Sequence, residues 1–237
     1  MRIDKEKCNG CGICNMYCPV KAITTADKKS QIDEDLCTEC GNCLRNSGCK
    51  PGAIYQQPLE FPRTIRSTLS NVLTIYKGVT GRGTEEMKTN DVTGRFKPGF
   101  CGVAVELGRP GISSTMRDLE KVAKVVAAHG GGFEDCNPIT EHIVNKKTGE
   151  LDPVVLNERI LSGIIEAVVD LKDLEPMVRD IIKVSKDLDT VFSLCVACKI
   201  DEGGKIPARD ILDKAGIPYR PNGKTCIGVG RPAYHFN

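Results

Sequence analysis

Apolar and polar positions follow their clearest regular pattern in the second half of the chain, from residue 99 onward. Residues 101–107 read Cys-Gly-Val-Ala-Val-Glu-Leu, and such an apolar run is typical of a strand. A helix is predicted next, because the hydroxyl side chains at 113–115 offer N-cap oxygens. Its apolar residues recur at i, i+3, i+4 and i+7, which places them on one face: Leu119, Val122, Ala123 and Val126.

The pattern continues with two strands, a second helix and a final strand. In order, these are a strand at 133–144 that bends at Pro138, a strand at 160–169, a helix opened by Asp173 and Pro176, and a strand at 190–196. The succession β-α-β-β-α-β is that of the ferredoxin-like α+β sandwich, in which two helices cover one face of an antiparallel sheet. We expect the strand order 4-1-3-2.

A C-terminal extension follows, with a short helix at 207–215 and a hairpin that turns at 221–224. Residues 99–237 are therefore predicted to form one α+β domain. Its turn Arg109-Pro110-Gly111 resembles the entry of an ACT-type ligand-binding domain, which uses the same sandwich. That resemblance implies ligand sensing, whereas the same residues also suit an ordinary tight turn between strand and helix.

Residues 58–98 are predicted to form a basic, glycine-rich connecting segment. Pro58 and Pro62 interrupt the chain at its start, and residues 64–76 fit a helix or a strand equally well. Five glycines and five basic side chains lie within residues 77–99. Glycine lets backbone N–H groups approach an anion, and arginine can clamp a phosphate or carboxylate. This stretch either binds an anionic ligand or acidic partner, or is a solvated linker.

Cysteines dominate the start of the chain. Eight of the thirteen cysteines lie in the 44 residues from Cys8 to Pro51. They form two C-x-x-C-x-x-C runs, each followed by a single cysteine: Cys8, Cys11, Cys14 and Cys18, then Cys37, Cys40, Cys43 and Cys49. This spacing suits an iron–sulfur cube, because three thiolates from one tight loop wrap one face of the cube and the fourth comes from elsewhere.

The two runs belong to an internal duplication. Ile3-Asp4-x-x-x-Cys-x-x-Cys-Gly-x-Cys is repeated 29 residues later from Ile32-Asp33, and Ala-Ile pairs close both halves. Residues 1–57 resemble the bacterial two-[4Fe–4S] ferredoxin module, in which each cluster takes its fourth ligand from the other half. The resemblance implies a first cluster on Cys8, Cys11, Cys14 and Cys49, and a second on Cys37, Cys40, Cys43 and Cys18.

The second half departs from this module in one loop. Five residues separate Cys43 from Cys49, where the first half has three, and Pro51 follows the last cysteine by two positions. We expect the insertion to enlarge a loop near the first cluster. Zinc would leave the third cysteine of each run without a role, and disulfides would need an oxidising compartment.

Five cysteines lie outside this region: Cys101, Cys136, Cys195, Cys198 and Cys226. Three interpretations stay open. They form a third iron–sulfur or zinc site, since a C-x-x-C pair and two distant thiols supply four ligands. Alternatively, Cys195 and Cys198 form a redox-active dithiol, or all five are inert buried thiols.

Composition narrows the class of protein. With a net charge of +2, no tryptophan and 5% aromatic residues, the chain has no basic stripe with interleaved aromatics, so we expect no nucleic-acid binding. No run of about 18 apolar residues occurs and no apolar signal stretch follows Met1, so we expect neither a membrane span nor export. Oxygen-labile clusters in a cytoplasmic protein indicate an anaerobic host.

These features predict an electron-transfer protein that serves as the iron–sulfur subunit or dedicated ferredoxin partner of a larger oxidoreductase. No acid–base or nucleophile constellation accompanies the cysteine runs, so we expect a non-catalytic subunit. Two other functions stay open. One is an oxidoreductase in its own right, with a third metal or thiol centre in the C-terminal domain. The other is a ligand-responsive, ACT-like regulatory iron–sulfur protein.

Overall fold

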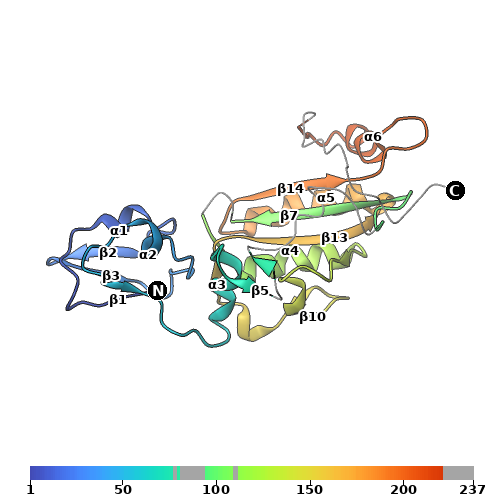
Figure 1. Ribbon diagram of the computed structural model, residues 1–237. Helices are drawn as coiled ribbons and strands as arrows, with labels where there is room; N and C mark the ends of the chain where they lie inside the picture. Colours follow the sequence, from blue (N-terminus) through green and yellow to red (C-terminus); the bar gives the residue numbers. More distant parts are fainter. Residues whose placement is uncertain (77–78, 81–93, 109–111, 221–237) are drawn as a thin grey trace.

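The computed structural model describes residues 1–76, 79–80, 94–108 and 112–220. A small N-terminal part lies beside a larger C-terminal part, with helix α3 (Thr64–Ser70) between them (Figure 1). The described chain combines helices with sheets, so the predicted α+β fold class is confirmed. Within these ranges, no helix is long and apolar enough to span a membrane.

Two small antiparallel sheets and two short helices make up the N-terminal part. The first and last strands pair with each other, and the two middle strands form a hairpin. Each helix carries the last cysteine of one run. In chain order the elements are β1 (Arg2–Ile3), α1 (Ile13–Met16), β2 (Ile23–Ala26), β3 (Lys29–Ile32), α2 (Asn42–Asn46) and β4 (Ile54–Tyr55).

The two halves of the duplication adopt the same local backbone geometry. The N–H of Cys8 donates to the carbonyl of Asp4 at 3.0 Å, and the N–H of Cys37 donates to the carbonyl of Asp33 at 3.0 Å. Each run then turns into its helix through a glycine at positive φ, 71° in the first half and 72° in the second. The repeated sequence therefore places the two cysteine runs in equivalent positions.

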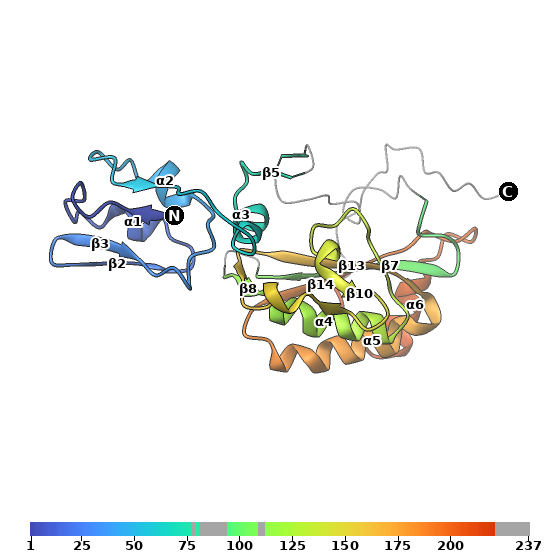
Figure 2. The ribbon, with the colours of Figure 1, turned by 90° about the horizontal axis from the view of Figure 1, so that it is seen from below.

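A four-stranded antiparallel sheet organises the C-terminal part. Its neighbours are, in order, β14 (Phe192–Ala197), β7 (Phe100–Leu107), β13 (Gly163–Asp170) and β9 (Gly132–Phe133). This is the order 4-1-3-2 along the chain, as expected from the sequence. Helices α4 (Met116–Ala128) and α5 (Leu171–Val184) lie together on one side of the sheet (Figure 2).

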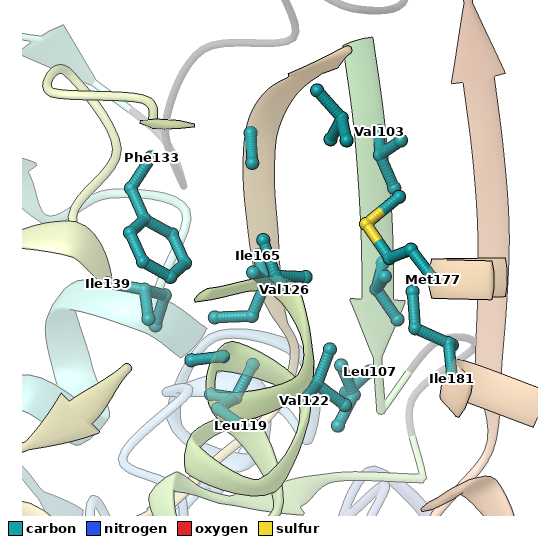
Figure 3. Packing of buried hydrophobic residues seen from close by; sticks show 14 of the residues in the cluster. Val103, Leu107, Leu119, Val122, Val126, Phe133, Ile139, Ile165, Met177 and Ile181 are labelled. Carbon is teal, nitrogen blue, oxygen red and sulfur yellow. The ribbon is translucent and has the colours of Figure 1, made fainter. Parts of the chain in front are cut away.

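The main hydrophobic core fills the space between this sheet and the two helices. Side chains from β7, β13, α4 and α5 meet there, among them Val103, Leu107, Ile165, Leu119, Val122, Val126, Met177 and Ile181 (Figure 3). Ile65 and Leu69 of α3 belong to the same core, although the sequence places them in the connecting segment. Helix α3 is therefore packed against the C-terminal part.

Of the predicted strand at 133–144, only Phe133 lies in the main sheet, as the second residue of β9. Asn137 gives the physical reason, because its side-chain Nδ2 donates to the carbonyl of Ile164 at 3.0 Å, a carbonyl on β13. That amide therefore satisfies an acceptor that a longer edge strand would have used. Beyond it, β10 (Ile143–Asn145) pairs with β11 (Glu150–Leu151) outside the main sheet.

The second long helix begins earlier than the sequence predicts. Asp170 caps it by accepting a hydrogen bond from the N–H of Lys172 at 3.0 Å, so the helix starts directly after β13. Pro176 consequently lies inside α5 and does not open it. The remaining elements are β5 (Ile75–Tyr76), β6 (Val79–Thr80), β8 (Ser114–Thr115), β12 (Arg159–Ile160), α6 (Pro207–Lys214) and 3₁₀ turns at Thr140–His142, Pro153–Val155 and Ser185–Asp187.

Three sequence predictions fall on residues outside the described ranges. These are the ACT-like turn at 109–111, the hairpin at 221–224 and most of the basic stretch at 77–99. Arg95, a described member of that stretch, forms an ion pair with Glu134.

We predict that two glycines with similar backbone angles differ in their tolerance of alanine. Gly130 and Gly149 have φ angles of 71° and 76°, but only at Gly149 would an added Cβ meet backbone, 2.3 Å from the carbonyl oxygen of Ala123. Gly130→Ala should lower the free energy of unfolding by about 1 kcal/mol, because alanine is strained at positive φ. Gly149→Ala should lower it by about 1–3 kcal/mol more, because the β10–β11 hairpin would be pushed off α4.

Denaturant titration of both variants checks this difference. Equal losses of stability would show that the contact with α4 does not matter.

Candidate metal centre

Four cysteines from both halves of the duplication line a cavity of about 330 Å³ in the N-terminal part. Cys8, Cys11 and Cys14 come from the first run, and Cys49 reaches the same cavity from the second half. Ser47, in the inserted loop, also lines it. The other walls are mainly apolar: Ile3, Ile13, Pro51, Ala53 and Ile54. The structure thus brings together the four cysteines that the sequence assigns to the first cluster.

A second cavity, of about 290 Å³, has the reciprocal composition. Cys37, Cys40 and Cys43 line it from the second run, and Cys18 reaches it from the first half. Apolar side chains again form most of the remaining wall, among them Met1, Val20, Ala22, Ile23 and Ile32. Helix α1 links the two cavities. Cys14, within the helix, lines the first cavity, and Cys18, just after the helix, lines the second.

Backbone N–H groups point at two of these sulfur atoms. The N–H of Ser30 donates to Sγ of Cys8 at 3.3 Å, and the N–H of Ala22 donates to Sγ of Cys18 at 3.1 Å. Such hydrogen bonds stabilise thiolate sulfur and are among the interactions that tune an iron–sulfur cluster. All eight cysteines are free thiols. The donor set therefore fits soft, thiolate-ligated iron.

Burial raises the pKa of Cys14, Cys37 and Cys43, so free thiolates are unfavourable at these three positions. It raises the pKa of Cys43 to about 12, and the charges of Cys37, Cys40 and Cys18 add to the effect. At Cys8 burial also acts to raise the pKa, but N–H groups of Ser30 and Gly10 outweigh it and hold the pKa below its ordinary value. Positive charge from bound iron would compensate the repulsion and displace the protons.

A buried charge network that was not predicted lies next to the second cavity. Glu39 lies between Cys37 and Cys40 in the sequence and is fully buried. It pairs with the ammonium group of Met1 and with Nε of Arg63 at 2.8 Å. Burial works to raise the pKa of Glu39, but these two cations hold it below its usual range. Arg45 donates to the carbonyl of Cys40 at 2.8 Å. A charged residue inside a C-x-x-C pair was the only available signal.

The remaining cysteines do not converge on one site within the described residues. Ala197 pairs with Gly102, so Cys198 follows beside Cys101, and both pack against the main core. Burial raises the pKa of Cys101 to about 12, with the charge of Cys198 adding to it. Cys195 and Cys136 are exposed, and Cys226 lies outside the described ranges. In the described chain, no three His, Cys, Asp or Glu side chains lie close enough together to hold a single metal ion; this includes the eight module cysteines, which are spread around the walls of two cavities.

Comparison with known proteins points to the same N-terminal segment. Residues 1–24 match the family model of the 4Fe–4S binding domain. Ferredoxin Fdx2 of Sorangium cellulosum is 40% identical over 62 residues, which cover 26% of this chain and 61% of the relative. The N-terminal segment is a bacterial-type ferredoxin module.

Two further relatives are matched over a similar share of their own length. Pyruvate synthase subunit PorD of Methanothermobacter marburgensis is 44% identical over 48 residues, 20% of this chain and 56% of the relative. Ferredoxin-1 of Rhodobacter capsulatus is 45% identical over 40 residues, 17% of this chain and 62% of the relative. The chain therefore spans about 60% of the length of these curated relatives. No solved structure matches the chain. The family match and the ferredoxin relatives support [4Fe–4S] binding by this module.

We predict that Cys49, despite its longer loop, is required for full iron loading. Cys49→Ala removes one of four sulfurs from the first cavity, so iron content should fall from about eight atoms per chain to about seven or fewer. Cys136→Ala, which removes an exposed cysteine outside both cavities, is the matched control and should retain all the iron.

Iron and acid-labile sulfide analysis of anaerobically purified protein measures both variants. Full iron content in the Cys49→Ala variant would show that Cys49 is not an iron ligand.

Proposed function

We propose that the protein transfers single electrons through two [4Fe–4S] clusters, one in each cavity of the ferredoxin module. The observation that carries this proposal is the exchange of the fourth cysteine between two cavities of similar size. Two groups of four thiols, each built from three cysteines of one run and one of the other half, form the donor set of a two-cluster ferredoxin. The ligands are those assigned from the sequence.

The chain's own residues bind, shield and space the two centres. A [4Fe–4S] cluster, when bound, supplies one-electron redox chemistry at a potential set by its surroundings. The apolar walls limit access of water, and N–H groups of Ser30 and Ala22 stabilise negative sulfur. Helix α1 keeps the two sites close, because only three residues separate Cys14 from Cys18.

We further propose that this relay serves a larger oxidoreductase, as its iron–sulfur subunit or dedicated ferredoxin partner. One of the relatives is by its name a subunit of pyruvate synthase, which supports a role for such a module in a multisubunit enzyme. Apolar side chains on α1 and beside it are exposed next to the cavities: Ile13 by 41%, Met16 by 77% and Tyr17 by 40%. A partner protein that covers them would bring its own redox centre close to the clusters.

The C-terminal part we assign as a ferredoxin-like sandwich. Its strand order, its antiparallel pairings and its two helices on one side of the sheet support this assignment. A cytoplasmic and anaerobic setting stays a prediction; the free thiols of the twelve described cysteines suit a reducing compartment. Recognition of an anionic ligand at residues 77–99 stays a prediction.

We expect the protein, purified anaerobically from its native host, to contain about eight iron and eight sulfide per chain and to accept about two electrons in a coulometric titration. Four iron atoms and one electron would contradict the two-cluster proposal, and about twelve iron atoms would instead indicate a third centre. A catalytic subunit that co-purifies would identify the reaction served.

The exposed apolar surface at α1 gives a prediction for the partner. Met16→Glu should slow electron transfer with the co-purifying oxidoreductase by about tenfold or more, because a charge would have to be desolvated at the contact. Ile182→Glu places the same charge on an exposed position of α5 and should leave the rate unchanged. Stopped-flow reduction compares the two variants, with dithionite reduction as the check that the clusters remain intact. Equal rates would place the docking surface elsewhere.

A further inference from the structure

Arg66, on helix α3, is buried against the loop that leads into the second cysteine run. Arg66 is only 5% exposed, and its Nη1 donates hydrogen bonds to three main-chain carbonyls. The acceptors are those of Glu34 at 2.9 Å, Asp35 at 3.0 Å and Cys37 at 2.8 Å. The guanidinium group therefore holds the turn before the second cavity and contacts the carbonyl of a cavity cysteine directly.

The same guanidinium group is paired with the C-terminal part of the chain. Nε of Arg66 forms an ion pair with Oε2 of Glu158, 92 positions further along. The backbone of Glu158 is fixed in turn, because its N–H donates to Val155 and its carbonyl accepts from Met116 at the start of α4. Arg66 and Glu158 together thus connect the first turn of α4 to the loop that enters the second cavity.

Helix α3 itself is positioned by the C-terminal part. Ile65 and Leu69 pack in the main core, and Oγ of Ser70 accepts a hydrogen bond from the N–H of Leu161 at 2.8 Å. Arg66 consequently extends from a fixed helix toward the ferredoxin module. The hydrogen bonds from Arg66 to the module therefore start from a helix that the C-terminal part holds in place.

From this geometry we infer that Arg66 is a positioning residue for the second cluster, through which the C-terminal part of the chain sets that cluster's reduction potential. The inference rests on the proposed function, because it requires a cluster in the second cavity. Reduction adds negative charge to the cluster, and a buried cation bonded to a ligand's carbonyl favours that added charge. Glu158 moderates the effect, because its carboxylate partly cancels the charge of the guanidinium group.

The first cavity has no comparable connection to the C-terminal part among the described residues. The carbonyl of Cys8 accepts from Nζ of Lys29 at 2.7 Å, but Lys29 is exposed and belongs to the module's own β3 strand. Its charge is therefore screened by solvent. A change at Arg66 should affect the potential of one cluster and leave the other unchanged.

The test compares Arg66→Gln, Glu158→Gln and the double variant by film voltammetry of the anaerobically purified full chain. Arg66→Gln removes the cation and leaves the carboxylate, so one potential should fall. Glu158→Gln leaves the cation unmoderated, so the same potential should rise. At fixed ambient potential, each shift should change the ratio of reduced to oxidised cluster about tenfold, or about 59 mV for one electron. The double variant should lie between the single variants.

Arg117→Gln is the matched control, since Arg117 bonds to Asn157 beside Glu158 but is exposed and does not contact the module. It should leave both potentials unchanged. Shifts of the same sign in the two single variants would reduce Arg66 to a packing role and overturn the inference. If Arg66→Gln fails to assemble, an unchanged potential in Glu158→Gln would also overturn it.

Iron analysis separates this inference from the proposed function on which it rests. If the wild-type protein contained only four iron atoms, there would be no second cluster, and both the proposed function and the role of Arg66 would fail. With about eight iron atoms and unchanged potentials in the variants, only the role of Arg66 would fail. The wave that shifts should also persist in Cys49→Ala protein, which alters the first cavity.

Discussion

Repulsion among closely packed sulfur atoms is the constraint on which the N-terminal part depends. Each of its two cavities gathers four cysteines, and burial opposes the ionisation of Cys14, Cys37 and Cys43 by raising their pKa. Backbone N–H groups aimed at sulfur and cationic side chains at ligand carbonyls reduce that cost from outside the cavities. Under the proposed function, positively charged iron inside the cavities would supply further compensation. The small apolar core of this module packs around the cavity cysteines themselves, so its stability and its metal content are linked.

The parts of the fold that could be predicted from the sequence are those set by local spacing. Three cysteines at intervals of three residues fix one face of a cluster, and a duplicated run predicts a second equivalent site. The alternation from residue 99 onward likewise predicted the succession of strands and helices, because burial of one face imposes a period of two or 3.6 on the chain. Even there, the side-chain amide of Asn137 replaced most of one strand, which no periodicity reveals.

The parts that escaped prediction depend on contacts between distant residues. Arg66 and Glu158 are paired across 92 positions, and neither belongs to a recognisable motif. Glu39 could be noticed only as a charge inside a C-x-x-C pair, while its partners Met1 and Arg63 lie far from it in sequence. Residues 58–98 are predicted only to connect the two domains, and the sequence does not decide between helix and strand at 64–76. Helix α3 of this segment instead packs in the main core and contacts the ferredoxin module.

The reciprocal placement of Cys18 and Cys49 has a consequence for how the ferredoxin module is constructed. Each half of the duplication lines one cavity with three cysteines and the other cavity with one. This is the relation between the subunits of an isologous dimer, in which each surface is completed by the same surface of a second copy. The module therefore has the architecture of two similar halves, each of which completes the cavity of the other. Neither half holds a complete set of four ligands, so the shortest self-sufficient unit of this architecture is the pair.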